Sequence, residues 1–209
     1  MKPYRPSWQL ESLLWSRGYH LVAGVDEAGR GALAGPVAAA AVILPYGEYP
    51  FNDSKALNAE VRELLAAEVK RVALAWGLGW ASAQEIDDIN VLAATKLAAR
   101  RAVNRLELKP TALVTDYLKL GAPWPTLAVA KGDQRSLQVA AASLLAKTER
   151  DQLMRRYARA YPQYGFAGHK GYGAPRHLVA LDQHGPCPIH RLSYKPVAQR
   201  RLFPVSDLA

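Results

Sequence analysis

The chain has 209 residues, half of them hydrophobic, and its charged residues, 22% of the total, are interspersed rather than gathered in blocks, which excludes a largely disordered protein and allows one domain with a substantial core. The single cysteine, Cys187, excludes an intrachain disulfide and a cysteine-based zinc site, as is typical of a reducing compartment. The formal net charge of +9 favours a polyanionic partner, most commonly nucleic acid.

The sequence shows neither a secretion signal nor a membrane span. In the first twenty residues, polar side chains interrupt the apolar positions, which is unlike the layout of a signal peptide. The longest apolar stretch, residues 31–44, is too short and too rich in Gly, Ala and Pro to cross a membrane. We therefore expect a cytoplasmic protein.

The first part of the chain predicts helices and strands in alternation. The apolar spacing over residues 8–16 indicates a short helix. Two apolar runs, 20–29 and 36–45, are joined by a Gly-rich link and predict neighbouring buried strands. Asn58 is expected to cap a helix over 58–72, and residues 73–81 predict a third strand.

The second part predicts a long helix, two strands and another long helix. Residues 87–90 are expected to open a helix that continues through 91–108, with its acidic residues at the start, where the helix dipole favours them. Runs 111–116 and 126–133 predict two strands, and a helix is expected from about 136 to 161. These elements predict an α/β domain with a central sheet over residues 1–160. Residues 161–209, rich in His, Gly and Pro, are expected to form a C-terminal extension that contributes to substrate binding.

Basic residues gather on two of the predicted helices and favour a nucleic-acid surface, with an ordinary solvated helix face as the alternative. These residues are Arg100, Arg101, Arg105, Lys109, Arg150, Arg155, Arg156 and Arg159.

Three aspartates share one context, because Asp26, Asp116 and Asp133 each end a predicted strand. A single such Asp is more commonly a cap or turn residue, but ligands of open α/β sheets bind at strand ends, and Glu27 adds a fourth acid. Like charges about 4 Å apart repel by roughly 4 kcal/mol, so a shared pocket needs cations. Oxygen ligands alone favour Mg²⁺ or Mn²⁺ over zinc, and a basic chain with such a pocket indicates phosphodiester chemistry.

Adjacent strand residues point to opposite faces of a sheet, which separates Asp26 from Glu27. For both side chains to reach one pocket, we expect the strand to end or twist there. Gly29 and Gly31 make such a change of direction easy.

Several segments together resemble ribonuclease HII, the bacterial type 2 ribonuclease H. DEAGRG at 26–31 and AAASLLAK at 140–147 are highly specific, whereas VTD or DSK alone would mean little. The matching segments are residues 24–37, 53–57, 114–116, 131–151 and 161–177.

The resemblance implies a ribonuclease H-like fold, with a mixed five-stranded sheet flanked by helices and a small C-terminal helical extension. It implies a metal-dependent endonuclease that hydrolyses the RNA strand of RNA/DNA hybrids. Such an enzyme also nicks duplex DNA 5′ of embedded ribonucleotides, leaving 5′-phosphate and 3′-hydroxyl ends, and so serves to remove ribonucleotides from DNA. We expect a monomer with no membrane partner and a two-metal-ion mechanism.

Position by position, the resemblance assigns metal binding and catalysis to Asp26, Glu27, Asp116 and Asp133, with Mn²⁺ or Mg²⁺ as the cofactor. It implies that the loop at 29–31 recognises the ribonucleotide 2′-hydroxyl and that Tyr172 stacks on the neighbouring sugar, the alternative for Tyr172 being a packing role. The substrate-binding residues expected in this way are Gly29, Arg30, Gly31, Tyr172, Ser54, Lys55, Ser143 and Lys147.

Two positions depart from the family pattern. Tyr117 follows the third acid where bacterial members usually have Gly, which bears on the shape of that loop and on the room for substrate. DSKAL at 53–57 replaces the more usual DSKKL and removes one basic residue.

Asp151, which lies among arginines, is expected to form a structural ion pair.

The four histidines of the C-terminal part of the chain match no common metal-ligand spacing. We expect them on the surface or near phosphates. They are His169, His177, His184 and His190.

Two other functions remain possible on this sequence. One is a catalytically silent module that binds RNA/DNA hybrids on the same fold, against which the presence of all four acids argues. The other is a structural protein in which the acids only cap loops.

Overall fold

The computed structural model describes residues 5–51 and 57–202. Within them, five strands form one sheet in the order β3-β2-β1-β4-β5. β1 pairs antiparallel with β2 and parallel with β4, so the predicted mixed five-stranded sheet is confirmed. The strands are β1 (Val22–Ala28), β2 (Val37–Ile43), β3 (Ala75–Ala81), β4 (Ala112–Asp116) and β5 (Thr126–Val129).

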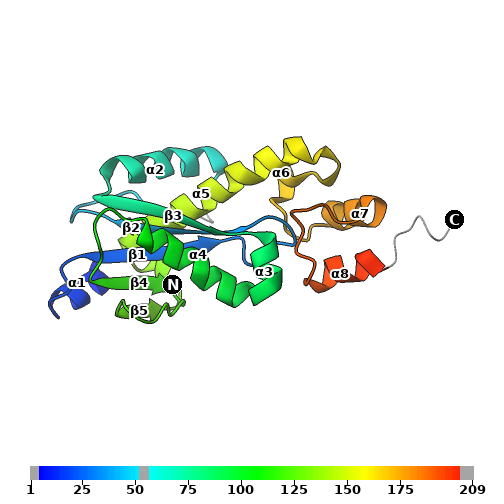
Figure 1. Cartoon of the computed structure of the whole chain (residues 1–209). Coiled ribbons are helices and arrows are strands. Elements are labelled where there is room, and N and C mark those ends of the chain that lie inside the picture. Colours follow the sequence, from blue (N-terminus) through cyan, green and yellow to red (C-terminus); the bar gives the residue numbers. More distant parts are fainter. Residues whose placement is uncertain (1–4, 52–56, 203–209) are drawn as a thin grey trace.

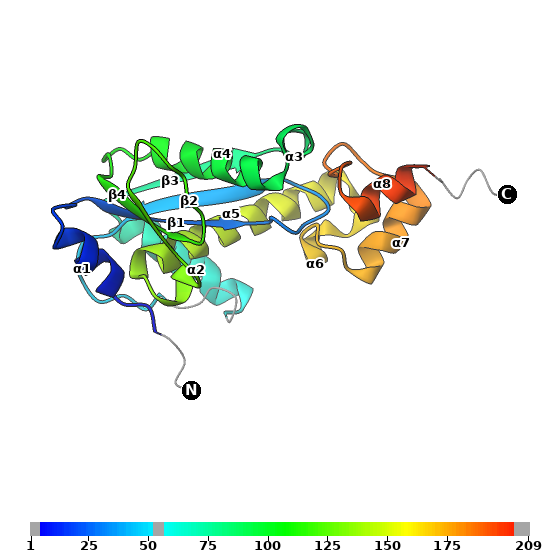
Figure 2. The ribbon, with the colours of Figure 1, turned by 90° about the horizontal axis from the view of Figure 1, so that it is seen from below.

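Helices cover both faces of the sheet (Figure 1). α4 (Val91–Asn104) packs on one face, and α5 (Leu137–Ala160) and α2 (Ala59–Val72) cover the other, as Figure 2 shows from below. α1 (Gln9–Trp15) packs beside α5 on that second face. The flanking helices and the long α5 agree with the expected fold.

Small side chains let the helices approach the central strand β2 from both sides. All seven residues of β2 are buried, and four of them are alanines. Ala39 and Ala41 pack with alanines of α4, while Ala40 and Val42 pack with alanines of α5. A strand buried on both faces is nearly continuous in apolar residues, which is the pattern of residues 36–45.

The C-terminal helices lie together at one end of the sheet (Figure 1). They are α6 (Phe166–His169), α7 (Pro175–His184) and α8 (Lys195–Leu202), preceded by the short 3₁₀ helix η2 (Pro162–Tyr164). Their buried side chains, with Tyr164 and Phe166 among them, pack on Leu33 and on Met154 of α5. The small C-terminal helical extension is thus present, while its role as a separate substrate-binding region from residue 161 stays a prediction.

The predicted single helix from residue 87 is two helices. α3 (Ala83–Ile89) begins with a capping box in which Ser82 and Glu85 each bind the other's backbone N–H, so Asp87 and Asp88 lie at its end. Asn90, at φ +66°, breaks the chain direction, and its side chain accepts hydrogen bonds from Leu92 N and Ala93 N at 3.0 and 3.1 Å. The acidic pair therefore does not start α4, which begins from the Asn90 cap instead.

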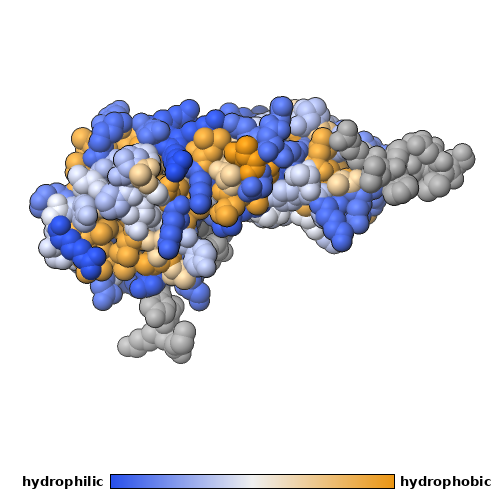
Figure 3. Space-filling model, turned by 60° about the horizontal axis from the view of Figure 1, so that its bottom comes forward, coloured by the Kyte–Doolittle hydropathy of each residue, from blue (hydrophilic) through white to orange (hydrophobic). Residues whose placement is uncertain are grey.

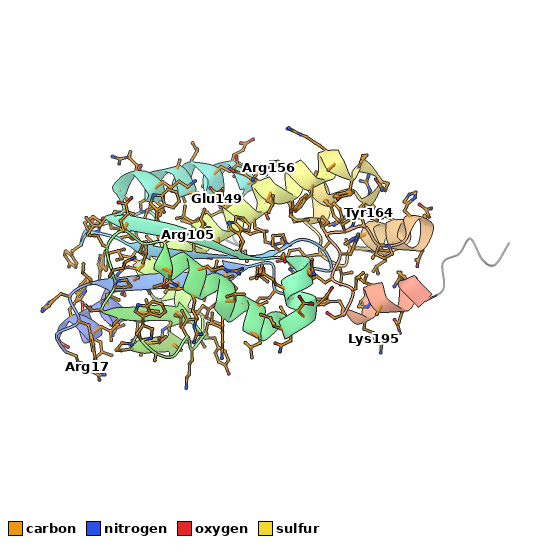
Figure 4. The ribbon with its side chains drawn as sticks, in the orientation of Figure 1. Arg17, Arg105, Glu149, Arg156, Tyr164 and Lys195 are labelled. Carbon is orange, nitrogen blue, oxygen red and sulfur yellow. The ribbon has the colours of Figure 1, made fainter. Side chains whose placement is uncertain are left out.

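The arginines of α4 bind the fold rather than forming a free basic face. Arg100, Arg101 and Arg105 donate to the carbonyls of Leu120, Trp80 and Leu78 at 2.6, 2.7 and 2.6 Å. Figure 4 shows Arg105, the residue that follows α4, beside the sheet. Leu78 and Trp80 lie in β3, an edge strand of the sheet, so their free carbonyls gain donors from this helix. The nucleic-acid surface predicted on this helix stays a prediction.

The surface is mixed in polarity. On the face shown in Figure 3, hydrophobic residues form separate patches interrupted by hydrophilic ones. In the described part of the chain, no helix has the length and apolar content needed to span a bilayer.

Candidate active site

A cavity of about 430 Å³ opens at the carboxyl-terminal end of β1. Because β1 and β4 are parallel, this is also the end at which β4 places Asp116. The cavity is lined by Asp26, Glu27, Ala28, Gly29, Arg30, Gly31, Asp116, Ser143, Lys147 and Tyr172. Most of the residues predicted from sequence are thus brought together, from segments up to 146 positions apart (26 to 172).

The remaining predicted residues are placed differently. Asp133 is buried in the short helix η1 (Gly132–Gln134) that follows β5. The N–H of its neighbour Gly132 donates to the Asp116 carboxylate at 3.1 Å, so the backbone next to Asp133 contacts an acid of the cavity, although Asp133 is not among the lining residues. Ser54 and Lys55 lie outside the residues that the structure describes.

β1 continues past the two acids, so of the two expected alternatives the one in which the strand ends at Asp26 is wrong. Asp26 and Glu27 both pair with β2, opposite Ala40 and Ala39. The parallel pairing with β4 stops earlier, at Val25 and Thr115. β1 therefore extends beyond its neighbour, and a cavity at that exposed edge is accessible to side chains from both faces of the strand.

Asp26 is a buried carboxylate in an acidic environment, with 6% of its surface exposed. Burial raises its pKa well above the usual range for Asp, the charge of Glu27 raises it further, and the charge of Asp116 adds to this. A hydrogen bond from Ser143 acts in the opposite direction. Such a cluster is costly as it stands, and a bound cation would relieve it.

The acids fit a hard divalent cation held by few protein ligands. Among the described residues, no group of three or more His, Cys, Asp or Glu side chains is arranged to enclose an ion. Mg²⁺ in particular is usually held by one or two carboxylates, with water and substrate phosphates completing its shell. The oxygen-rich lining, with Asp26, Glu27 and Asp116 around one open cavity, agrees with that mode of binding.

Cationic side chains lie around the acids. Arg30 approaches Glu27, with Nη1 and Oε1 3.3 Å apart. Lys147 donates to Asp151 at 2.8 Å, and Asp151 also pairs with Arg62 at 3.4 Å, so the predicted structural ion pair of Asp151 is confirmed. Lys147 nevertheless lines the cavity and is partly exposed, and the Tyr172 ring lies 5.9 Å from its Nζ.

Arg150 is a fully buried side chain that the sequence indicated only as part of a basic helix. Its guanidinium donates to the carbonyls of Pro36, Lys170 and Ala34 at 2.9, 3.0 and 3.2 Å, and lies 5.4 Å from the Tyr172 ring. It thereby links the segment after β1 to the segment that carries Tyr172.

The two glycines of the loop have different surroundings. Gly29 has φ +94°, and a Cβ there would lie 1.9 Å from Nε of Arg150, so only glycine fits. A Cβ on Gly31 would meet no atom within 4 Å, and Gly31 lines the open cavity. Gly29 is thus required by the protein interior, whereas Gly31 leaves its backbone accessible to a ligand.

Arg191 is a second buried arginine that sequence reasoning missed. It donates to the carbonyls of Gly29 and Arg30, each at 2.7 Å, and to Gly35 at 3.0 Å. The loop at 29–31 is therefore held from the C-terminal extension. No local pattern around PIHRL marks this role, since it depends on which carbonyls the fold leaves unpaired.

A chain of hydrogen bonds fixes the backbone at Tyr172. His177 Nδ1 lies 2.8 Å from the Tyr172 carbonyl and must donate to it, so His177 Nε2 accepts from His190 Nε2 at 2.9 Å. His190 Nδ1 in turn accepts from the Cys187 N–H at 2.9 Å. Both histidines are neutral in this arrangement.

The surface position predicted for the histidines is wrong for His177 and His190, which are 0% and 2% exposed. Burial lowers the pKa of both, and for His190 burial and the neighbouring His177 lower it to about 4. Their neighbours are aromatic rings and backbone groups, which accept a neutral imidazole but not a charged one.

The chain is similar throughout most of its length to known ribonucleases. The family model for Ribonuclease HII matches residues 23–197. Ribonuclease HII from a strain of Thermus thermophilus is 57% identical over 196 residues, 93% of this chain and 96% of that relative. Ribonuclease HII of Syntrophotalea carbinolica is 50% identical over 192 residues, 90% of this chain and 92% of the relative. The crystal structure of ribonuclease H2 from Pyrococcus horikoshii OT3 superposes with a TM-score of 0.74 at 25% identity, covering 87% of this chain and 97% of that one.

Acidification is expected to destabilise the protein through His190. Its folded-state pKa of about 4 lies below the ordinary value of 6.5, so between these values the unfolded chain binds a proton that the folded protein excludes. Stability contributed by the neutral ring is present above pH ~6.5 and is lost as the pH falls toward ~4, on the order of 3 kcal/mol. Urea unfolding of wild type and His190→Gln across this range should show a smaller pH dependence for the variant, with His184→Gln as the exposed control. Parallel curves for wild type and His190→Gln would contradict this.

Arg191→Leu is expected to lower the free energy of unfolding by about 3 kcal/mol or more, because buried carbonyls of Gly29, Arg30 and Gly35 lose their donor. Chemical denaturation measures the loss. Arg156→Leu is the matched control, since Arg156 is exposed on α5 (Figure 4). Equal stability of the two variants would show that Arg191 does not hold the loop.

Proposed function

Since the chain belongs to the ribonuclease HII family, it is a ribonuclease H, an endonuclease that hydrolyses phosphodiester bonds, and we propose that the cavity at the ends of β1 and β4 is its active site. The substrates proposed are RNA/DNA hybrids and duplex DNA that contains single ribonucleotides. Cleavage 5′ of the ribonucleotide then leaves a 3′-hydroxyl on the upstream strand and a 5′-phosphate on the ribonucleotide.

The observation that carries the proposal is the burial of Asp26 beside Glu27 and Asp116 in a cavity rimmed by Arg30 and Lys147. A module that only bound hybrids would gain nothing from such acids, because they repel phosphates. Acids that merely capped loops would not need to gather at one open edge. Metal-assisted hydrolysis accounts for both the acids and the cations around them.

Divalent metal dependence is a property of the family, and we propose that the cofactor is Mn²⁺ or Mg²⁺, with two ions shared among the carboxylates of Asp26, Glu27, Asp116 and Asp133. When bound, the metal would activate the attacking water and stabilise the charge on the leaving 3′-oxygen. The hydroxyl of Ser143 donates to Asp26 and so holds that carboxylate in a fixed orientation.

The remaining residues of the cavity would position the substrate. Arg30 and Lys147 provide positive charge for the phosphates on either side of the acids. The exposed backbone at Gly31 is accessible to the 2′-hydroxyl, the group that distinguishes RNA from DNA. Tyr172, 38% exposed and backed by Arg150, presents its ring to a sugar at the same cavity. Ser54 and Lys55 stay candidates for phosphate contact.

We further propose that the protein acts as a monomer in the cytoplasm and that residues 161–209 contribute to substrate binding. Tyr172, which lines the cavity from that region, supports the last point.

Asp26→Asn is expected to abolish metal-dependent nicking of a duplex with one ribonucleotide, lowering kcat by at least about 10³-fold, because a charged metal ligand is lost. The metal-free variant should be no less stable than wild type, since the substitution removes a buried charge from an acidic cluster. Gel assays with Mg²⁺ and with Mn²⁺ measure the cleavage, and thermal unfolding measures the stability. Asp182→Asn, an exposed position on α7, is the control and should nick normally. Undiminished nicking by Asp26→Asn would refute the assignment.

Gly31→Ala is expected to lower kcat/KM on the ribonucleotide-containing duplex at least about tenfold, because the new methyl group occupies space that the substrate needs. Folding should be unaffected, since the added Cβ meets no protein atom within 4 Å. Gly168→Ala is a matched control, because a Cβ there also meets nothing within 4 Å and Gly168 lies in α6, away from the cavity lining. If both variants cleave alike, the 29–31 backbone does not contact the ribonucleotide.

A further inference from the structure

A second hollow, of about 520 Å³, adjoins the proposed active site and shares Arg30 with it. Its walls come from the start of α4 and from the segment that follows β4. We name it the Tyr117 groove, and the residues that matter are Arg30, Leu92, Lys96, Tyr117, Leu118 and Lys119.

The Tyr117 groove has the opposite charge to the acidic cavity. Arg30, Lys96 and Lys119 line it, and among its described lining residues there is no Asp or Glu. Tyr117 follows Asp116 directly in the chain, and Lys119 lies two residues further on, so the lining changes from acidic to basic within three residues. A phosphate chain that passes the acids therefore meets cations on this side.

Tyr117 is a strained and exposed aromatic residue. Its φ is +59°, a conformation costly for any residue with a side chain, and its N–H donates to the Val129 carbonyl at 3.0 Å, which fixes the turn. The side chain is 78% exposed, so no packing within the chain compensates for the strain. Beside it in the groove, Leu92 is 48% exposed.

An exposed ring, an exposed aliphatic side chain and three cations in one groove match the chemistry of a nucleic-acid strand. In a duplex the sugars and phosphates lie on the outside, so a sugar can pack on an exposed aromatic ring while lysines contact the adjoining phosphates. A protein partner would not require the cations to line the same hollow as the ring, and a free anion would not require the ring.

We propose that the Tyr117 groove binds a nucleotide of the substrate next to the bond that is cleaved. The sugar of that nucleotide packs on the Tyr117 ring, and its phosphate lies near Lys96 and Lys119. The proposal rests on the proposed function, because the groove extends the same active site. Tyr117 is then a substrate-binding residue that a chain with the usual glycine at this position lacks.

The test is binding of a fluorescent duplex with one ribonucleotide, measured by anisotropy at low salt with a metal chelator to prevent cleavage. Tyr117→Gly should bind about tenfold more weakly, because the ring is no longer buried against the substrate, whereas Tyr117→Phe, which keeps the ring, should bind within about twofold of wild type. The double variant Lys96→Ala/Lys119→Ala should have a salt dependence smaller by about two counterions. Glycine accepts φ +59°, so Tyr117→Gly should melt at the same temperature as wild type or higher.

Matched controls come from the opposite end of the sheet. Tyr46, 77% exposed, follows β2, and Arg17 precedes β1 (Figure 4 shows Arg17). The groove lies beyond the end of β4, at the other end of the sheet. Tyr46→Ala and Arg17→Ala should bind the duplex like wild type. A loss as large in Tyr46→Ala as in Tyr117→Gly would overturn the proposal.

Shortened duplexes locate the contact. Removing base pairs on one side of the ribonucleotide should weaken wild type about tenfold and leave Tyr117→Gly unchanged, because the lost contact is the same one. The proposal would be overturned if shortening the duplex and Tyr117→Gly weakened binding additively. It would also be overturned if only the lysine variants, and not Tyr117→Gly, bound the full duplex more weakly. Wild-type protein that fails to nick the duplex with Mg²⁺ or Mn²⁺ would instead refute the proposed function, which keeps the two failures distinct.

Discussion

The guanidinium groups of Arg150 and Arg191 hold the segment on which the proposed site depends. Residues 29–36 leave β1 without a neighbouring strand, and buried carbonyls without partners would be costly. Arg150 supplies donors to Ala34 and Pro36, and Arg191 supplies donors to Gly29, Arg30 and Gly35. Arg150 extends from the long helix of the sheet domain and Arg191 from the C-terminal extension, so the loop is fixed only when both are in place.

The same contacts account for the glycine at position 29, the fixed backbone at Tyr172 and the buried neutral histidines. Glycine is needed at position 29 because Arg150 occupies the space that a side chain would take. Tyr172 is held by the hydrogen bond from Arg150 to the Lys170 carbonyl and by the hydrogen bonds through His177 and His190. Neutral histidines serve well here, because each ring nitrogen has one donor or acceptor role that its neighbours complete. The basic residues that the fold consumes in this way are not available to a substrate, which leaves Arg30, Lys147, Lys96 and Lys119 around the cavity and groove.

Charge is separated over short distances around Asp116. The acids lie where β1 extends past β4, and the cations lie just beyond, in the Tyr117 groove. A polyanionic strand is thereby attracted to the surface by the cations, while a metal ion can neutralise the acids at the reacting phosphate. The strained backbone at Tyr117 lies at the boundary between the two, as is common for residues at binding sites.

The strands, the long helix α5 and the gathering of Asp26, Glu27 and Asp116 were predictable from the sequence, because apolar periodicity and residues at strand ends are local signals. The motifs also determined the family. Other features became visible only in the folded protein: β1 continues through its acids, α3 and α4 are separate, the α4 arginines bind carbonyls, and His177 and His190 are buried. Each of these depends on which backbone groups and surfaces remain unpaired after the chain has packed, and that is settled by contacts between segments far apart in the sequence.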